Sequence, residues 1–597
     1  MVFPIALEPA DMGQVYSAVL GFLAVVTLLS SGYVLKIGIG ALRWTKQYNR
    51  DKDTDWYAAW EIARHGASGE QIHDWHAVQH FVIVPNYKEP IQMLRLLANT
   101  LLSQRASMRR QITLVLAMEE REGQPAKDKA SHLVHDLRRY FRDVLCTFHP
   151  ADLPGEIKGK ASNFRWAIAE VEATIRCTPG LRAEDILIHV ADADSLYDPN
   201  YLPNVTYLFC THPERHEFVY QPCMIPTCNF WALAAICRQV NVVIAAQEMM
   251  SAREPLEFQI PFSTYGLSLT TLQLIGGTGN AADAQDGDVI AEDHHLFIKG
   301  YFALDGRLRV QPIFLPCLNF SVGDQPRSFV ANLCDRYIQA KRHMFGISEL
   351  FYMMSLMAHG SGCCRSGQSR WLRSFRGRLR TARLLAKLIK IHSVPYAGLW
   401  ILMGLALVGI LRLQMLVCNT KALRSHLVCD DTLASVTHSE GAFFFSAATT
   451  FTLLGGMLVT VSFARMLYVT HHTLTNIGDP NGDFMGSFQE ESFGVSGPST
   501  ARPRRPVSVG SGFPWVGTVL QLLVEFVVCG LISSLFFGSI PALLGLLRLI
   551  WKGHTLEYVI APKPGEALVA VGEETPALPE AGLPQAGLPV PRPRGSG

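Results

Sequence analysis

Four long apolar blocks constrain the fold of this chain more than any other feature of its sequence. They span Tyr16–Leu35, Ser393–Leu411, Ala442–Ala464 and Trp515–Leu547, and together they contain one charged residue, Glu525. A helix of about 20 apolar residues crosses about 30 Å of hydrocarbon. The composition, 49% hydrophobic and only 17% charged, also indicates that part of the chain lies in a bilayer. The sequence therefore predicts a multi-span α-helical membrane region beside one large soluble segment.

The last apolar block is too long for one straight span. As a continuous helix Trp515–Leu547 would reach about 50 Å. We expect either one span plus a re-entrant or interfacial piece, broken near Gly538 and Pro541, or a tight hairpin.

Basic residues indicate the orientation of the chain in the membrane. Glu8 and Asp11 precede the first block, whereas five basic residues follow it: Lys36, Arg43, Lys46, Arg50 and Lys52. The positive-inside rule therefore places the soluble segment in the cytosol. A cleaved signal peptide carries its positive charge before the apolar run, so the first block is expected to be a retained anchor. The membrane would be the plasma membrane or the Golgi.

A basic segment, Arg365–Lys390, joins the soluble segment to the second apolar block. Its arginines and lysines alternate with apolar residues such as Trp371, Phe375 and Leu379. This pattern is typical of a helix that lies among lipid headgroups on the cytosolic face. The alternative is a nucleic-acid-binding surface, which is disfavoured because the segment runs directly into a membrane span.

The soluble segment alternates between strand-like and helix-like runs. The strand-like runs are His80–Val84, Ile112–Leu116, Ile186–Val190 and Phe218–Gln221, and the intervening helices are expected over Ile91–Gln104 and Ala126–Val144. This alternation predicts an α/β domain with a mostly parallel sheet and helices on both faces.

The chain thus divides into six parts. We expect an N-terminal membrane helix (1–40), a linker (41–75), the soluble α/β domain (76–350), basic interfacial helices (351–392) and a membrane region (393–552). The remainder, 553–597, repeats a Gly-Leu-Pro unit and has few large apolar residues, so it is expected to be disordered.

The stretch Ile186–Asp198, ILIHVADADSLYD, ends an apolar run in two aspartates one residue apart. A short run rich in Ile, Leu and Val is typical of a buried strand, so Asp192 and Asp194 are expected where this strand leaves the sheet. Ligands of open α/β sheets bind at that edge. Two carboxylates there can hold a hard divalent cation and leave positions open for substrate phosphates. The alternative is that Asp194 caps the following turn and Asp192 is solvated.

Five motifs occur in the order FVIVPNYKEP, KGKASNF, DADS, AEDHHLF and QAKRH. In order and spacing they resemble the family 2 glycosyltransferases, in particular the membrane-embedded group that contains the cellulose, chitin and hyaluronan synthases. The resemblance covers about Phe81 to His343. It implies a GT-A fold that binds a nucleotide-diphosphate sugar, with UDP as the expected nucleotide. It also implies inverting transfer of the sugar to the end of a growing polysaccharide, with translocation of the product.

The resemblance assigns the nucleoside to the loop after the first strand. Pro85 to Glu89 would hold the base and ribose, with Tyr87 stacking and Glu89 accepting hydrogen bonds from hydroxyl groups. Glu119, at the end of the second strand, stands where the family usually has aspartate.

The resemblance also assigns the diphosphate site. Lys160 and Asn163 match a Lys-Ala-x-Asn element, in which the lysine neutralises diphosphate charge as a point cation. Asp192 would contact the nucleotide sugar and, together with Asp194, would bind Mn²⁺ or Mg²⁺, the cofactor that the resemblance implies. Lys158, nearby, is interpreted as a surface charge.

Three further motif positions carry the chemistry of transfer. Asp293 matches the family's base, which takes the proton of the acceptor hydroxyl. Gln339 and Arg342 match its Gln-x-x-Arg motif, whose arginine stabilises charge on the leaving diphosphate. The acceptor would contact three other residues: Glu292, His294 and His343. Because His343 stands where the family has tryptophan, the acceptor and processive synthesis stay open.

Some patterns keep a second interpretation. Asp283, Asp286 and Asp288 resemble part of a calcium loop but lack EF-hand spacing, so an acidic loop beside the acceptor site is favoured. For His294 and His295, packing or contact with the acceptor is favoured over a metal site. Two cysteines, Cys418 and Cys429, form a disulfide only if their compartment is oxidising.

Two other functions compete with polymer synthesis. The first is a single-addition transferase that acts on a lipid-linked or other membrane acceptor. The second belongs to another class, an inactive membrane scaffold or transporter. The sequence leaves the donor sugar, the linkage and the oligomeric state undetermined.

Overall fold

The computed structural model describes residues 9–66, 72–104, 106–253, 258–323, 328–359, 374–404, 406, 431–476 and 514–552. The expectations for the tail 553–597 and for Cys418 and Cys429 lie outside these residues. The same holds for parts of the second apolar block and of the basic segment before it.

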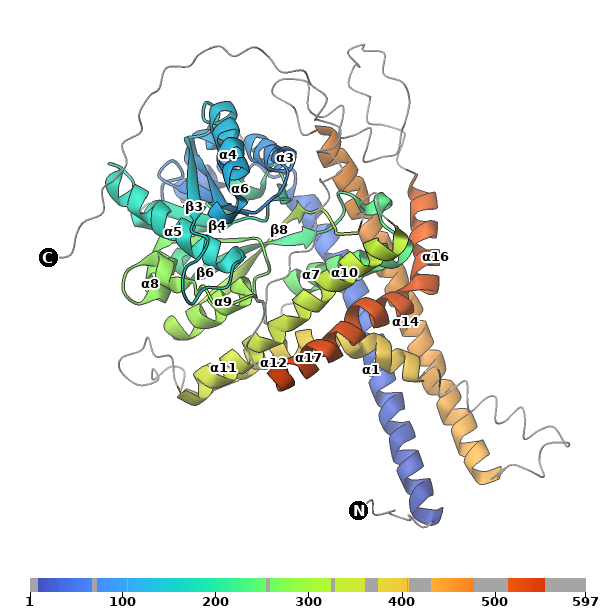
Figure 1. Cartoon of the computed structure of the whole chain (residues 1–597). Coiled ribbons are helices and arrows are strands. Elements are labelled where there is room, and N and C mark those ends of the chain that lie inside the picture. The colour runs from blue at the N-terminus through green and yellow to red at the C-terminus, as the bar shows by residue number, and fades with distance from the viewer. Residues whose placement is uncertain are drawn as a thin grey trace.

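One mixed sheet of eight strands forms the centre of the soluble domain (Figure 1). Its order is β3-β2-β1-β4-β7-β6-β8-β5. Six strands run in the same direction, and β5 and β7 run against their neighbours. The strands are β1 (Gln79–Asn86), β2 (Ile112–Glu119), β3 (Asp143–His149), β4 (Ile186–Val190), β5 (Leu196–Tyr197), β6 (Phe218–Ile225), β7 (Tyr265–Ser268) and β8 (Arg309–Leu318).

Helices cover both faces of the sheet because its strands alternate between two hydrophobic cores. On β1, Val82 and Val84 belong to one core, and Phe81 and Ile83 to the other. The first core includes residues of α3 (Ile91–Leu102), α4 (Gln124–Leu137), α6 (Tyr201–Thr211) and α7 (Ala235–Arg253). The second includes residues of α5 (Lys160–Cys177), α8 (Leu269–Gly276), α9 (Glu292–Ala303) and α12 (Phe375–Ser393). The prediction of a mostly parallel sheet with helices on both faces is confirmed.

The predicted helix Ala126–Val144 is wrong at its C-terminal end. Helix α4 ends at Leu137, and β3 begins at Asp143. Phe141 lies between the two elements and is buried. Its apolar side chain fits the helical spacing of apolar residues in the sequence, although Phe141 is not part of the helix. Edge strand β3 has a weak strand signal because three of its seven side chains are polar.

Besides β3, three strands were not predicted from the sequence. β5 and β7 are very short, with two and four residues. Pro312 and Pro316 interrupt β8, and proline normally argues against an inner strand. A register shift in the pairing of β6 with β8, next to Pro222, accommodates them.

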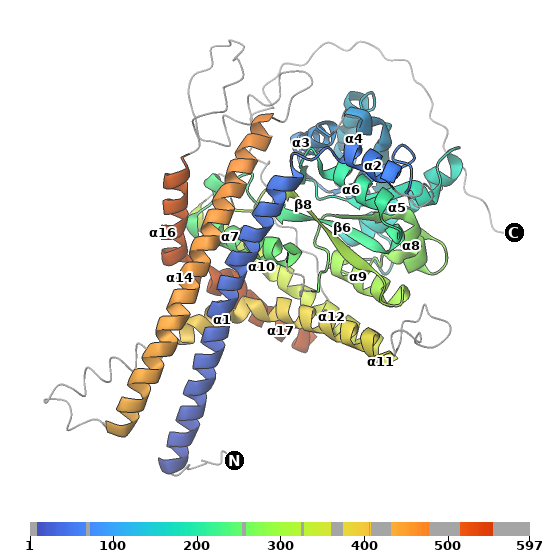
Figure 2. The ribbon, with the colours of Figure 1, turned by 180° about the vertical axis from the view of Figure 1, so that it is seen from behind.

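Three described helical segments are long and apolar enough to cross a membrane: Gly21–Asp51, Ala447–His471 and Trp515–Trp551. The first two lie within α1 (Pro9–Asp51) and α14 (Asp431–Asn476), which run side by side and extend beyond the sheet domain (Figures 1 and 2). Gly455 allows the close approach of these helices, since a Cβ there would lie 2.6 Å from the backbone of Leu35.

The last apolar block is broken where the sequence predicts. Helix α16 (Trp515–Ser534) passes through a π-helical turn, Leu535–Ser539, into α17 (Ile540–Lys552). Helix α17 turns away from α16 and runs beside α10 (Phe329–Met344), below the sheet domain in Figure 1. Of the two predicted arrangements, the structure has one long helix plus a crosswise piece, not a hairpin.

Candidate functional site

A cavity of about 880 Å³ opens at the carboxyl ends of β1 and β4. Parallel strands place the residues that follow them at one edge of the sheet. The loop after β1 and the Asp192–Asp194 turn after β4 therefore meet there, and both line the cavity. From this edge the cavity extends between α7, α10 and α12 to the π-helical turn after α16. The sheet edge and the apolar helices thus share one space.

Lys160 forms an ion-pair cluster at the base of the cavity. It is the first residue of α5, and its Nζ lies 2.7 Å from Oδ1 of Asp192 and 2.9 Å from Oε1 of Glu292. Nζ also donates a hydrogen bond of 2.5 Å to the Ser263 carbonyl. Burial would lower the pKa of the Lys160 ammonium, but the two carboxylates outweigh burial and raise it. Lys160 is therefore a fixed cation at a helix N-terminus.

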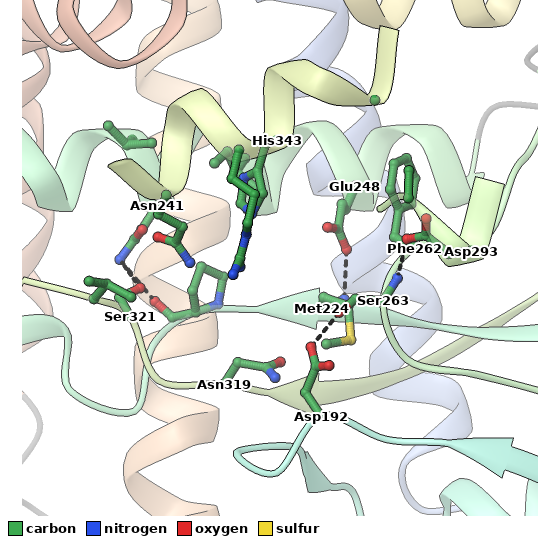
Figure 3. A pocket seen from close by; sticks show the side chains of 18 of the residues that line it. Asp192, Met224, Asn241, Glu248, Phe262, Ser263, Asp293, Asn319, Ser321 and His343 are labelled. Atoms are coloured by element: carbon green, nitrogen blue, oxygen red, sulfur yellow. Dashed lines mark hydrogen bonds between the residues drawn. The ribbon is translucent and has the colours of Figure 1, made fainter. Parts of the chain in front are cut away.

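Ser263 connects the cation cluster to Asp293. Its hydroxyl donates to Oδ2 of Asp192, and its backbone N–H donates to Oδ2 of Asp293 at 2.6 Å (Figure 3). A second backbone N–H, from His294, donates to Oδ1 of Asp293 at 2.7 Å. Ser263 has a left-handed backbone, with φ of 45°, which is uncommon for a residue other than glycine. This conformation lets one residue bind both carboxylates.

Glu292 faces the cation cluster. Burial raises its pKa to about 7, although the Lys160 ammonium opposes this rise. The Glu292 carboxyl group lines the cavity and pairs with Lys160, and its predicted acceptor contact stays a prediction. Glu292 helps to position that lysine.

Asp192 and Asp194 supply the oxygen ligands that a divalent cation prefers. Both line the cavity, and Asp194 accepts a 3.3 Å hydrogen bond from the backbone N–H of Phe320. The two oxygens of Asp192 contact Lys160 and Ser263. Among the described residues no group of three His, Cys, Asp or Glu side chains forms a ready metal site. The donor atoms fit Mg²⁺ or Mn²⁺ if substrate phosphates complete the coordination and the cation shares Asp192 with Lys160.

The loop after β1 presents an aromatic ring to the cavity. The Arg121 guanidinium lies 3.9 Å from the centre of the Tyr87 ring, and the Tyr87 N–H donates to Glu89 at 2.6 Å. Pro85, near the end of β1, also lines the cavity, and Lys88 in the loop has a φ of 64°. The loop is thus held in a strained, specific shape.

Glu119 and Asn163, the two other predicted nucleotide contacts, bind neighbouring protein groups. The Glu119 carboxylate lies 3.0 Å from Nε of Arg121 and 3.3 Å from Nδ1 of His149. It therefore holds the arginine that stacks on Tyr87. Asn163 donates from Nδ2 to the Ala117 carbonyl at 2.9 Å, which ties α5 to β2. Both side chains still line the cavity.

Helix α10 brings the predicted residues Gln339, Arg342 and His343 to the cavity wall. Gln339 accepts a hydrogen bond from Arg336, whose other nitrogen donates to Asn241 at 2.9 Å. His343 is exposed to the space of the cavity (Figure 3).

His294 and His295 point to different surroundings. His294 is buried, and neither of its ring nitrogens has a hydrogen-bond partner among the described residues. It lines the cavity beside the Phe262 ring. His295 is a packing residue, bound to Asp286 and Glu349 at 2.8 Å each. Lys158 pairs with Asp152 at the surface, outside the cavity lining.

Sequence reasoning missed Ser263, Arg336 and Glu248. Glu248 points from α7 toward Met224, whose N–H donates to its carboxyl group at 2.7 Å (Figure 3). Burial raises the pKa of Glu248 to about 8, and the charge of Asp293 adds to the rise. A lone acid within the apolar run VNVVIAAQEMM was the available signal.

Comparisons with known proteins add little to this description. No protein family model matches the sequence, and no curated protein matches it. Among solved structures, the crystal structure of S. aureus TarS 1–349 aligns with a TM-score of 0.28 and 10% identity. The alignment covers 69% of this chain and 92% of that chain. A likeness at this TM-score carries no argument about function.

Proposed function

We propose that this protein is an inverting glycosyltransferase of the family 2 type, which takes its sugar from a nucleotide-diphosphate donor. The observation that carries this proposal is the bridge formed by Ser263. It joins Asp192, in a cluster suited to a diphosphate, to Asp293, which is suited to act as a base. Transfer needs both functions in one cavity, with a distance between them that is fixed before the substrates bind.

The donor is proposed to lie along the carboxyl edge of the sheet. Tyr87, backed by Arg121, offers a ring for stacking on the nucleobase, which is proposed to be uracil. Lys160, at the N-terminus of α5, would bind the diphosphate through its charge and the helix dipole. Asp192 and Asp194 would hold Mg²⁺ or Mn²⁺, which would neutralise the same phosphates.

Asp293 is proposed to act as the base. One carboxylate oxygen of Asp293 takes the proton of the acceptor hydroxyl, and the acceptor oxygen attacks the anomeric carbon. The bond from this carbon to the diphosphate oxygen breaks on the opposite face, which inverts the configuration. The electron pair stays on the diphosphate, where Lys160 and Arg342 compensate the charge. The N–H groups of Ser263 and His294 orient the base.

The acceptor is proposed to enter from the membrane side of the cavity. His294 and His343 line the same cavity as Asp293, and the cavity continues to Ser533 and Phe537 of the last apolar segment. This continuity supports an acceptor that is held at the cytosolic membrane face. Both a growing polysaccharide, which would then be translocated, and a lipid-linked acceptor fit this description.

The test uses the purified full-length protein and a panel of radiolabelled nucleotide sugars, with Mg²⁺ or Mn²⁺ and with a chelator. We expect label transfer from one donor, and a product of the opposite anomeric configuration. Long products support polymer synthesis, and a single added sugar supports the lipid-linked alternative. If no donor is consumed under any condition, the transferase proposal is wrong and a scaffold or transporter is favoured.

A further inference from the structure

A second groove, of about 390 Å³, lies along the N-terminal half of α12, whereas the C-terminal half of this helix lines the main cavity. Its walls are one face of α12, the start of β8 and the segment at Phe258. Arg376, Arg380 and Arg383 line it, and their spacing of four and three residues places them on one face of the helix. None of these arginines belongs to the site described above.

The groove has an excess of positive charge. Its fourth arginine, Arg309, contacts Glu214 and Glu217 at the β8 end. Within the described part of the chain, Arg376 and Arg380 form no ion pair within 4 Å. The Arg380 guanidinium instead donates to the Leu308 carbonyl at 3.3 Å and lies 5.8 Å from the Phe258 ring.

Burial in this groove disfavours the charge of Arg380. Burial lowers its pKa, and Arg309 and Arg383 add to the lowering, whereas Tyr301 and Glu217 oppose it. A partly buried cation that faces other cations is stabilised by an anion between them. The arrangement therefore favours a ligand with at least one phosphate-like charge.

An apolar stripe runs along α12 next to the groove. Phe375, Leu379 and Ile389 are 82%, 52% and 47% exposed, and they share one side of the helix. The opposite side packs into the core through Leu384 and Leu388. Helix α12 lies crosswise to α1 and α14, near the level where those long helices leave the sheet domain (Figure 2). A helix with this exposed stripe fits the boundary between lipid headgroups and acyl chains.

We propose that the arginine groove on α12 binds the phosphate headgroup of an anionic membrane lipid, with the acyl chains along the apolar stripe. The occupant is a lipid because the cationic groove and the apolar stripe adjoin. A soluble anion would bind in the cationic groove and leave the apolar stripe exposed. This site does not depend on the sugar-transfer chemistry proposed above.

The test is photo-crosslinking of the full-length protein, in neutral detergent, to phosphatidic acid with a photoreactive acyl chain. We expect crosslinks that map to α12, and competition by unlabelled phosphatidic acid but not by phosphatidylcholine. The triple variant Arg376→Gln, Arg380→Gln, Arg383→Gln should lower the apparent affinity roughly a hundredfold. A control triple variant, Arg138→Gln, Arg139→Gln, Arg176→Gln, removes the same charge from the surface of the sheet domain and should bind like the wild type.

A double variant guards against misfolding. Arg376→Gln with Arg383→Gln leaves the partly buried Arg380 in place and should still lose most of the binding, while triple Arg→Lys substitution should keep much of it. Crosslinking that is unchanged in both glutamine variants overturns the proposal. So does equal competition by inorganic phosphate or by a short single-stranded RNA, which would make the groove a site for soluble anions or nucleic acid.

Discussion

The Lys160 ammonium lies 2.7 Å from Oδ1 of Asp192, although the two residues come from different elements, the N-terminus of α5 and the turn after β4. This ion pair sets the charge at the point where the proposed diphosphate binds. The same lysine contacts Glu292, next to the proposed base. One cation therefore connects the donor side of the site with its catalytic side.

Replacing Lys160 with methionine should weaken nucleotide binding. The substitution keeps the length of the side chain and removes its charge, and a hydrogen bond to a charged group contributes about 1.5–3 kcal/mol. We expect the affinity for UDP, measured by calorimetry, to fall about 10- to 100-fold. Lys158→Met is the matched control, because Lys158 pairs with Asp152 at the surface. Equal affinity in Lys160→Met and the wild type would contradict the diphosphate role.

The buried ion pair between Arg238 and Glu525 should stabilise the contact of α7 with α16. Nε of Arg238 lies 3.1 Å from Oε2 of Glu525, and both side chains are largely buried. Removing one partner of a buried pair typically costs about 3–5 kcal/mol. Glu525→Met should therefore lower the unfolding temperature strongly, as measured in detergent.

The double variant Arg238→Met, Glu525→Met separates charge from packing. It leaves no uncompensated charge, so we expect it to be more stable than either single variant. Additive losses in the double variant would mean that the pair does not interact.

Stability should fall at alkaline pH because of His295. Burial alone would lower the pKa of this imidazole, but Asp286 and Glu349 raise it from 6.5 to about 9. Because the pKa of His295 is higher in the folded protein, its protonation stabilises the fold. This contribution to the free energy of unfolding is fully present below pH 6.5 and is lost as the pH rises through about 9. The shift corresponds to on the order of 3 kcal/mol.

The measurement for His295 is the unfolding temperature as a function of pH. The wild type should lose stability between pH 6.5 and 9 more steeply than His295→Gln, which cannot titrate. Parallel curves for the two proteins would show that His295 is not the titrating group.

The sequence allowed prediction of the features that arise from local patterns. Strands β1, β2, β4 and β6 have strong apolar runs, so their positions were predictable, and the residues at the ends of β1 and β4 followed from the sheet. The break near Gly538 followed from the length of the last apolar block.

The missing parts of the site depend on tertiary geometry. Ser263 matters because its left-handed backbone directs an N–H and a hydroxyl to two carboxylates, and a single serine in a sequence gives no sign of this. Glu248 depends on how α7 packs across β6, and Glu292 turned out to face Lys160. Such contacts depend on how elements that are distant in the sequence pack together. The periodicity of apolar residues does not predict this packing.

Asp194→Ala should remove a proposed metal ligand while the protein stays folded, since this residue lies in a turn. We expect loss of transfer together with a sharp fall in nucleotide affinity in the presence of Mg²⁺ or Mn²⁺. The affinity measured with a chelator should differ little from that of the wild type. Normal turnover in this variant would exclude Asp194 as a ligand.

The most direct test of the proposed site is the comparison of transfer rate and nucleotide affinity in Asp293→Asn. Asparagine keeps the size of the side chain, but it cannot take the acceptor proton. Its single oxygen can accept one of the two hydrogen bonds that Ser263 and His294 donate to the separate oxygens of Asp293. We expect the transfer rate to fall about 10²- to 10⁴-fold, with the affinity for UDP unchanged. If Asp293→Asn instead lost nucleotide binding and kept its turnover per bound donor, Asp293 would be a donor-site residue and the proposed mechanism would be wrong.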